Sequence, residues 1–250
     1  MTLIEVLVCL AVVGVLLALL SGPLAAVREG AKRTRSLQSL ASIARGFHAY
    51  TQDFAGSWPY FTHVGFGDNV IAGGGLRVEV ASFFDAFQTW HIALADGYFS
   101  GNASSEALFP PRYAGEGTGV EMRPWFTSYH YPCAFIAHPD FWNPYRRTGP
   151  GQWGGTRADQ VAFPGSKALV VEGVRGEGAP RSSRGGRRDL ARARLVATCD
   201  GGARPLPWES LQGGYERGDG FIFKDSGAVH YADSPALLHT TDGVRGRDVR

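Results

Sequence analysis

The residues of this chain that could perform chemistry gather in one nine-residue stretch. His130, Cys133 and His138 supply the imidazole and thiolate groups that bind zinc, and a catalytic zinc site would keep a fourth position open for water. No second pair of ligands follows at a standard spacing, and histidines beside tyrosine and proline are more often packed polar groups. We therefore assign no metal site, and a metal-dependent hydrolase stays an alternative function.

Aspartates in turn-rich sequence form a second set of candidate ligands, in this case for calcium. They are Asp200, Asp219, Asp225 and Asp242. Carboxylate oxygens suit Ca²⁺, but no EF-hand spacing connects these four residues. The sequence also contains neither a Gly-x-Ser-x-Gly nucleophile elbow nor a His-Glu-x-x-His zinc motif. We therefore predict a protein that is not an enzyme and needs no cofactor, with calcium binding by these carboxylates as the alternative.

A third candidate for a functional role is Glu5, an acid inside an otherwise apolar segment. From Leu3 to Leu20 all residues except Glu5 are apolar or small. Eighteen residues at about 1.5 Å each span roughly 27 Å, close to the thickness of a bilayer core. An ionisable residue in such a segment is by default functional and needs a partner. Glu5 is only about 6 Å along a helix from the chain start. We expect it to pair with the α-amino group of an identical, axially staggered neighbour.

The N-terminal segment resembles the first helix of type IV pilins and type II secretion pseudopilins. The resemblance is carried by the box Thr2-Leu3-Ile4-Glu5-Val6, by Gly14, by Pro23 and by the run from Ala26 to Arg33. It implies that Glu5 and Met1 register subunits in a filament. It also implies that a prepilin peptidase removes a short basic leader and methylates Met1. Basic residues follow the apolar segment, so the positive-inside rule supports the same expectation that the reading frame starts upstream.

The resemblance implies a subunit of a type IV pilus or a type II secretion filament. Its partners would be other pilin or pseudopilin subunits, the inner-membrane assembly platform and the prepilin peptidase. It would cross the inner membrane once with its head in the periplasm, and lie in a periplasmic or extracellular filament after assembly. The alternatives are a secretory signal peptide, or a plain anchor for a periplasmic carbohydrate-binding domain or hydrolase. A net charge of +2 gives no reason to expect nucleic acid as a partner.

A weaker resemblance concerns a pilin subgroup with the C-terminal signature His, nine residues, Asp-Gly. The stretch LVATCDGGARPL is similar to its Asp-Gly hairpin, but Leu190 stands ten positions before Asp200. His230 precedes Asp242-Gly243, with eleven residues between. The subgroup match is therefore partial.

The elements that must position these residues are a long helix and a head domain. Apolar or small residues recur every three or four positions from Leu24 to Phe54, which is typical of an amphipathic helix with one buried stripe. We predict a transmembrane or assembly helix at 1–22, an amphipathic helix at 23–54, and a globular head at 55–250. Gly22 and Pro23 predict a kink between the two helical halves.

Within the head, the pattern predicts an α+β fold, with a small antiparallel sheet and extended loops on the long helix, and the resemblance implies that this fold is pilin-like. We expect a loop at 65–75, a helix at 82–95, a basic loop at 175–194, and strands at 133–137, 167–172, 195–199, 220–224 and 228–232. Aromatic residues at 110–164 suit either a sugar-binding or subunit-packing surface, or loops pinned by buried rings. Cys133 and Cys199 are candidates for a disulfide, with two separate buried thiols as the alternative.

Overall fold

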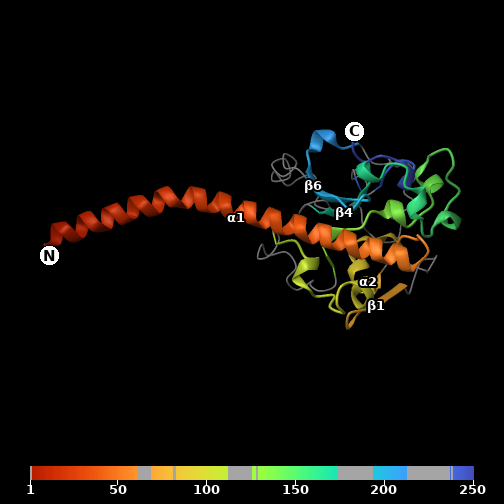
Figure 1. Ribbon diagram of the computed structural model, residues 1–250, viewed down its shortest axis with the longest axis horizontal. Helices are drawn as coiled ribbons and strands as arrows, with labels where there is room; N and C mark the ends of the chain where they lie inside the picture. Colours follow the sequence, from red (N-terminus) through yellow and green to blue (C-terminus); the bar gives the residue numbers. More distant parts are fainter. Residues whose placement is uncertain are drawn as a thin grey trace.

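The computed structural model describes residues 2–60, 69–80, 83–111, 126–127, 129–173, 194–212, 237 and 239–250. Helix α1 (Leu3–Asp53) projects from a head that contains the other described elements (Figure 1). The fold is α+β, with a long N-terminal helix and small antiparallel sheets, as the sequence predicts. The strands predicted at 220–224 and 228–232 and nearly all of the basic loop at 175–194 lie outside the described residues.

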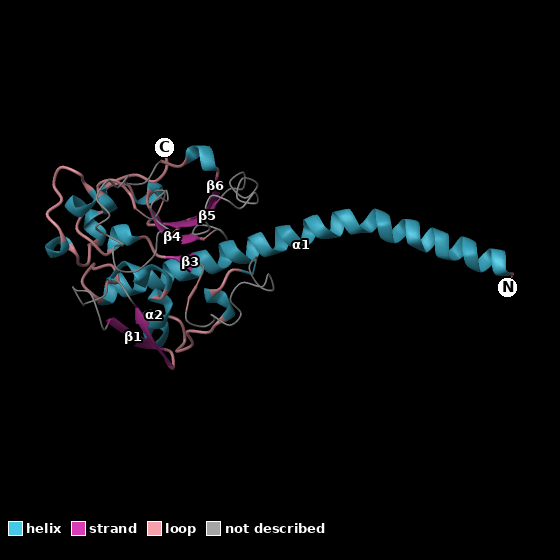
Figure 2. Ribbon diagram, turned by 180° about the vertical axis from the view of Figure 1, so that it is seen from behind, coloured by secondary structure: helices cyan, strands magenta, loops and turns pink. Residues whose placement is uncertain are grey.

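Helix α1 runs without interruption through Pro23. A proline inside a helix removes one N–H donor, so the carbonyl four residues earlier, at Leu19, loses its usual partner. The part of α1 that projects from the head is visibly curved (Figure 2). The predicted separation into 1–22 and 23–54 at Gly22 and Pro23 is therefore a bend within one helix of 51 residues.

Burial along α1 begins later than the apolar spacing predicts. The first buried side chain is Ser36, followed by Ser39, Leu40, Ile43, Ala44 and Phe47. Leu24 and Val27, which the predicted stripe includes, are 49% and 68% exposed. The predicted stripe is thus buried only from Ser36 onward, about three turns before Phe47. Before Ser36 the described head contacts α1 through the exposed Arg35–Glu106 ion pair and buries none of the described side chains.

The main sheet has four antiparallel strands in the order β3-β4-β5-β6. They are β3 (Tyr129–His130), β4 (Ala168–Glu172), β5 (Arg194–Thr198) and β6 (Ala203–Leu206). β4 and β5 confirm two predicted strands, and the Asp200-Gly201-Gly202 turn joins β5 to β6 as expected. Gly201 has φ +86°, and the Asp200 carboxylate accepts bonds from the Gly202 N–H and the Thr198 hydroxyl at 3.0 and 2.6 Å.

Both faces of the sheet are covered. Leu195 and Ala197 of β5 belong to the hydrophobic cluster that includes α1, whereas Val196 points to the other face, where it packs with Leu211 and Val249. Successive side chains of a strand alternate between faces, so this division follows from the pleat. All ten residues of β4 and β5 are buried in consequence.

A second layer lies on the opposite side of α1. It consists of α2 (Trp90–Tyr98) and a hairpin of β1 (Asn69–Gly73) and β2 (Leu76–Val80), joined by a small cluster that contains Ile71 and Ile92 (Figure 1). The loop predicted at 65–75 is therefore wrong from Asn69 onward. The predicted helix at 82–95 is also divided, into a 3-10 segment (Phe83–Gln88) and α2.

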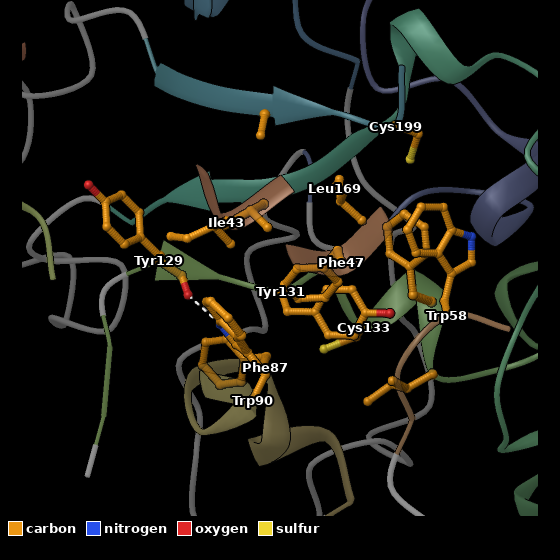
Figure 3. Packing of buried hydrophobic residues seen from close by; sticks show 14 of the residues in the cluster. Ile43, Phe47, Trp58, Phe87, Trp90, Tyr129, Tyr131, Cys133, Leu169 and Cys199 are labelled. Atoms are coloured by element: carbon orange, nitrogen blue, oxygen red, sulfur yellow. Dashed lines mark hydrogen bonds between the residues drawn. The ribbon is translucent and has the colours of Figure 1, made fainter. Parts of the chain in front are cut away.

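The centre of the head is aromatic (Figure 3). The Phe47 ring of α1 lies 5.0 Å from Trp90 and 4.8 Å from Tyr131, centroid to centroid. The Trp90 indole N–H donates to the Tyr129 carbonyl at 2.7 Å. The strand predicted at Cys133–Ala137 is wrong, because Cys133–Phe135 forms a 3-10 turn that directs Phe135 into this core. The described rings at 129–153 are mostly buried, as expected for loops pinned by aromatics.

Candidate assembly surface

The N-terminal part of α1 presents apolar side chains that the head does not cover. We call Leu3–Val27 the apolar rod. Large apolar side chains exposed by 41–79% are Leu3, Ile4, Val6, Leu7, Val8, Leu10, Val12, Val13, Val15, Leu16, Leu19, Leu24 and Val27. Because successive helical residues point about 100° apart, consecutive exposed positions place apolar groups on every side of the rod. A helix that is apolar all round is one that other apolar groups must cover.

Glu5 closes a capping box at the start of the rod. The backbone N–H of Thr2 donates to Glu5 Oε2 at 2.7 Å, and the N–H of Glu5 donates to Thr2 Oγ1 at 3.4 Å. The box satisfies two of the N–H groups that a helix start leaves unpaired, and the positive end of the helix dipole favours the carboxylate. Glu5 therefore has a partner within its own chain. Met1, the other predicted assembly residue, lies outside the described residues.

The capping box is the feature of this site that our sequence analysis missed. Its signal is Thr-x-x-Glu directly before an apolar run, which Thr2 and Glu5 satisfy. The role expected for Glu5 in pairing with a neighbour is not tested by a single subunit. Over the described part of the chain, no helix combines the length and hydropathy needed to cross a bilayer.

The rod ends at a run of charge. Arg28, Lys32, Arg33 and Arg35 are exposed, with Glu29 the one acid among them. Arg35 donates to Glu106 of the head at 2.5 Å, and both side chains are more than half exposed. An ion pair this open to water contributes little stability, so it marks where the head meets α1 and adds little to holding it there.

The structure does not assemble the predicted zinc ligands into one site. His130 lies in β3, where its Nε2 is 3.3 Å from the Gln88 amide nitrogen, and His138 Nδ1 accepts from the Asp140 N–H at 3.3 Å. Burial, with the charge of Arg194 in second place, lowers the pKa of His130 to about 3, so this imidazole is neutral at pH 7. Among the described residues no three His, Cys, Asp or Glu side chains form a metal-binding group.

The calcium candidates that can be placed have separate roles. Asp200 belongs to the β5–β6 turn, and hydrogen bonding from Thr198 is the main reason why its pKa is lowered. Asp242 has φ +59° and accepts from the Asn143 amide at 2.7 Å. Asp219 and Asp225 lie outside the described residues. Asp200 and Asp242 thus lie in separate turns, each with hydrogen bonds of its own.

Cys133 and Cys199 are free thiols in the structure, not the disulfide that we considered. Both are buried in the aromatic cluster, on either side of Phe47 and Tyr131 (Figure 3). Cys133 Sγ is 3.8 Å from the Phe84 carbonyl oxygen, and burial raises the pKa of Cys199 far above its usual value. Each side chain therefore packs as a small apolar group, and Cys199 remains a protonated thiol at neutral pH.

A buried ionic cluster is the other feature that sequence reasoning missed. Lys167 Nζ lies 3.1 Å from Asp248 Oδ2, and the two side chains are 0% and 2% exposed. The Thr240 hydroxyl bonds both groups, and Oδ2 also accepts from the Ala168 N–H at 2.9 Å. The cluster fastens the C-terminal segment to the start of β4. Spacing in the sequence carries no signal for it.

Comparison of the chain with protein families, with curated proteins and with solved structures finds no match. The function is therefore argued from the residues and their arrangement.

Proposed function

We propose that the chain is a pilin-like or pseudopilin subunit, which assembles through its apolar rod into a type IV pilus or a type II secretion filament. The observation that supports this is the rod itself, since its apolar side chains are exposed on every side and the described head covers none of them. Exposed apolar surface on this scale marks a surface that a partner or a membrane covers. Identical rods packed side by side would bury it in the core of a filament.

Glu5 gives such a bundle a register. A carboxylate in an apolar bundle requires a counter-charge, and the α-amino group of Met1 on an adjacent, axially shifted subunit can supply it. The capping box holds the carboxylate at the very start of the helix, which is where a neighbour's N-terminus can reach it. The N-terminal processing and methylation of Met1, and the cleaved leader, belong to this proposal.

The proposal includes location and partners. Before assembly the rod would lie in the inner membrane, with the head in the periplasm. The assembly platform and prepilin peptidase would act on it there, and the assembled filament would be periplasmic or extracellular. The head would then determine which partner the filament contacts. A role without catalysis or a cofactor is part of the same proposal.

Two variants separate the two roles of Glu5. Glu5→Gln keeps an oxygen that can accept from the Thr2 N–H but removes the charge, whereas Thr2→Ala removes the hydroxyl of the box but keeps the charge. We expect Glu5→Gln to abolish cross-linking between subunits in the native membrane while membrane insertion is unchanged. Thr2→Ala should retain most of the cross-linking.

The result that overturns the proposal is cross-linking of Glu5→Gln at the level of the unaltered chain. Glu29→Gln is a matched control, because Glu29 is also an exposed acid of α1 but lies beyond the rod. A chain recovered only as a soluble monomer trimmed after the rod would overturn the proposal as well, in favour of a signal peptide.

A further inference from the structure

Three cations directly after the apolar rod have one acid, Glu29, beside them on the helix. We call Arg28, Lys32 and Arg33 the basic collar. All three are exposed, and Arg28 and Lys32 are four residues apart, so they are neighbours on one face of α1. Arg35, one turn nearer the head, is paired with Glu106. The cation closest to the head is thus paired with the head, and the three closest to the rod exceed their one neighbouring acid by two charges.

The depth of the collar along α1 indicates what that partner is. If Leu3–Leu20 fills a bilayer core, Arg28 lies about 12 Å beyond its edge by helical rise. Helical side chains tilt toward the N-terminus, and long basic side chains extend farther in that direction, so the charges lie nearer the rod than their Cα atoms do. The headgroup layers add roughly 10–15 Å to the core in total, or about half of that on each side. By the same rise the Cα atoms of Lys32 and Arg33 lie about 18 and 20 Å beyond the core edge. The Arg28 charge therefore reaches the outer edge of the headgroup layer, and the other two charges lie in the water just outside it, within about a Debye length.

We propose that the basic collar binds anionic phospholipid headgroups of the membrane that holds the rod before assembly. The inference rests on the proposed function, since it requires the rod in a bilayer. Phosphate groups of phosphatidylglycerol type supply the negative charge, and the apolar rod brings them within a Debye length of the collar. Each basic residue close to an anionic surface increases the association about fivefold at low salt.

The depth of the collar also supplies a control for the test. A basic residue farther along α1, such as Arg45, lies about 26 Å from Arg28 by helical rise and is beyond the reach of the headgroups. Arg45 is also exposed and lies on the same helix. It therefore serves as the matched control.

The test uses the full chain in phosphatidylcholine vesicles that contain a spin-labelled lipid probe, either phosphatidylglycerol or phosphatidylcholine. We expect the unaltered chain to select phosphatidylglycerol by at least fivefold at low salt. The triple change Arg28→Gln, Lys32→Gln and Arg33→Gln should bring the ratio of the two association constants close to one, as should 1 M salt. Arg45→Gln should leave the ratio unchanged.

Equal association of the unaltered chain with both probes overturns this inference alone, because the rod is then in the bilayer without lipid selection. Failure of the chain to enter either kind of vesicle overturns the proposed function and this inference with it. Loss of subunit cross-linking in the triple variant, without any selection of phosphatidylglycerol by the unaltered chain, would assign the collar to a neighbouring subunit and also overturn it.

Discussion

Replacement of Asp248 by asparagine tests the buried ionic cluster. The substitution preserves shape, and the amide oxygen can still accept from the Ala168 N–H. It removes the negative charge 3.1 Å from Lys167 Nζ, in a place where neither side chain is appreciably exposed to water. Within the part of the chain that the structure describes, the lysine is then a buried cation without a counter-ion, and its remaining partners there are the Thr240 hydroxyl and the Phe135 ring, 5.7 Å away.

The expected loss is large because water cannot replace the missing charge. Breaking a buried ion pair by removing one partner costs about 3–5 kcal/mol, and a single domain has only about 5–15 kcal/mol of net stability. We expect Asp248→Asn to reduce the free energy of unfolding by about 3 kcal/mol or more. The double change Lys167→Met and Asp248→Leu removes both charges and should be much less destabilising than Asp248→Asn alone.

The assay is urea unfolding of the full chain in detergent, followed by tryptophan fluorescence, since Trp58, Trp90 and Trp142 are all buried in the head. Asp140→Asn is the matched control. Its carboxylate is 3.3 Å from Arg146, but that pair is exposed and should contribute less than about 1 kcal/mol. Equal losses for Asp248→Asn and Asp140→Asn would show that burial of the pair does not determine its contribution.

Three further outcomes follow from the structure. Phe47→Ala should cost about 3–5 kcal/mol in the same unfolding assay, because the ring is fully buried between Trp90 and Tyr131, whereas a truncation on the exposed rod should not change head stability. Burial lowers the pKa of His130 to about 3, so below pH 6.5 the unfolded chain binds a proton that the folded chain does not. The free energy of unfolding should therefore fall as the pH is lowered from 6.5 toward 3, and His130→Gln should make that fall less steep. Desolvation and the hydrogen bond to Asp53 raise the pKa of Tyr98 to about 12. Between pH 10 and 12 the unfolded chain therefore loses this proton while the folded chain keeps it, so stability that is present below pH 10 should be lost over that range. Tyr98→Phe should remove the loss.

Periodic apolar spacing made the long helix and the central strands predictable. The three-and-four spacing up to Phe54 matches a helix that ends at Asp53, and the apolar runs of β4 and β5 match strands buried on both faces. The spacing could not show where burial starts, because it records which side chains can be covered, not which part of the head reaches them. Ser36 is that point in the structure.

The hairpin at Asn69–Val80 and the turn at Cys133–Phe135 lie in stretches whose sequences suit more than one structure. Asn69–Val80 contains a short apolar run before Gly74-Gly75 and an alternating run, Leu76–Val80, after it. Both glycines have positive φ, at +55° and +79°. This is the backbone of a two-residue hairpin turn, whereas the surrounding glycines made the stretch look like a loop. The apolar run at Cys133–Ala137 is too short for periodicity to separate a strand from a turn. The conformation of this segment depends on its packing in a cluster that contains Phe47 of α1, which is far away in the sequence.

The capping box places a physical condition on the assembly that we propose. Glu5 is not an unsatisfied acid awaiting a partner, since its carboxylate already accepts from the Thr2 N–H at 2.7 Å. A carboxylate has two oxygens and about four acceptor positions, so a neighbour's amine can bind while the box remains intact. The neighbour must therefore supply a positive charge; a further hydrogen bond is not required. Water screens that charge on an isolated rod and is excluded from a bundle, so the pairing gains strength only as the rods pack together.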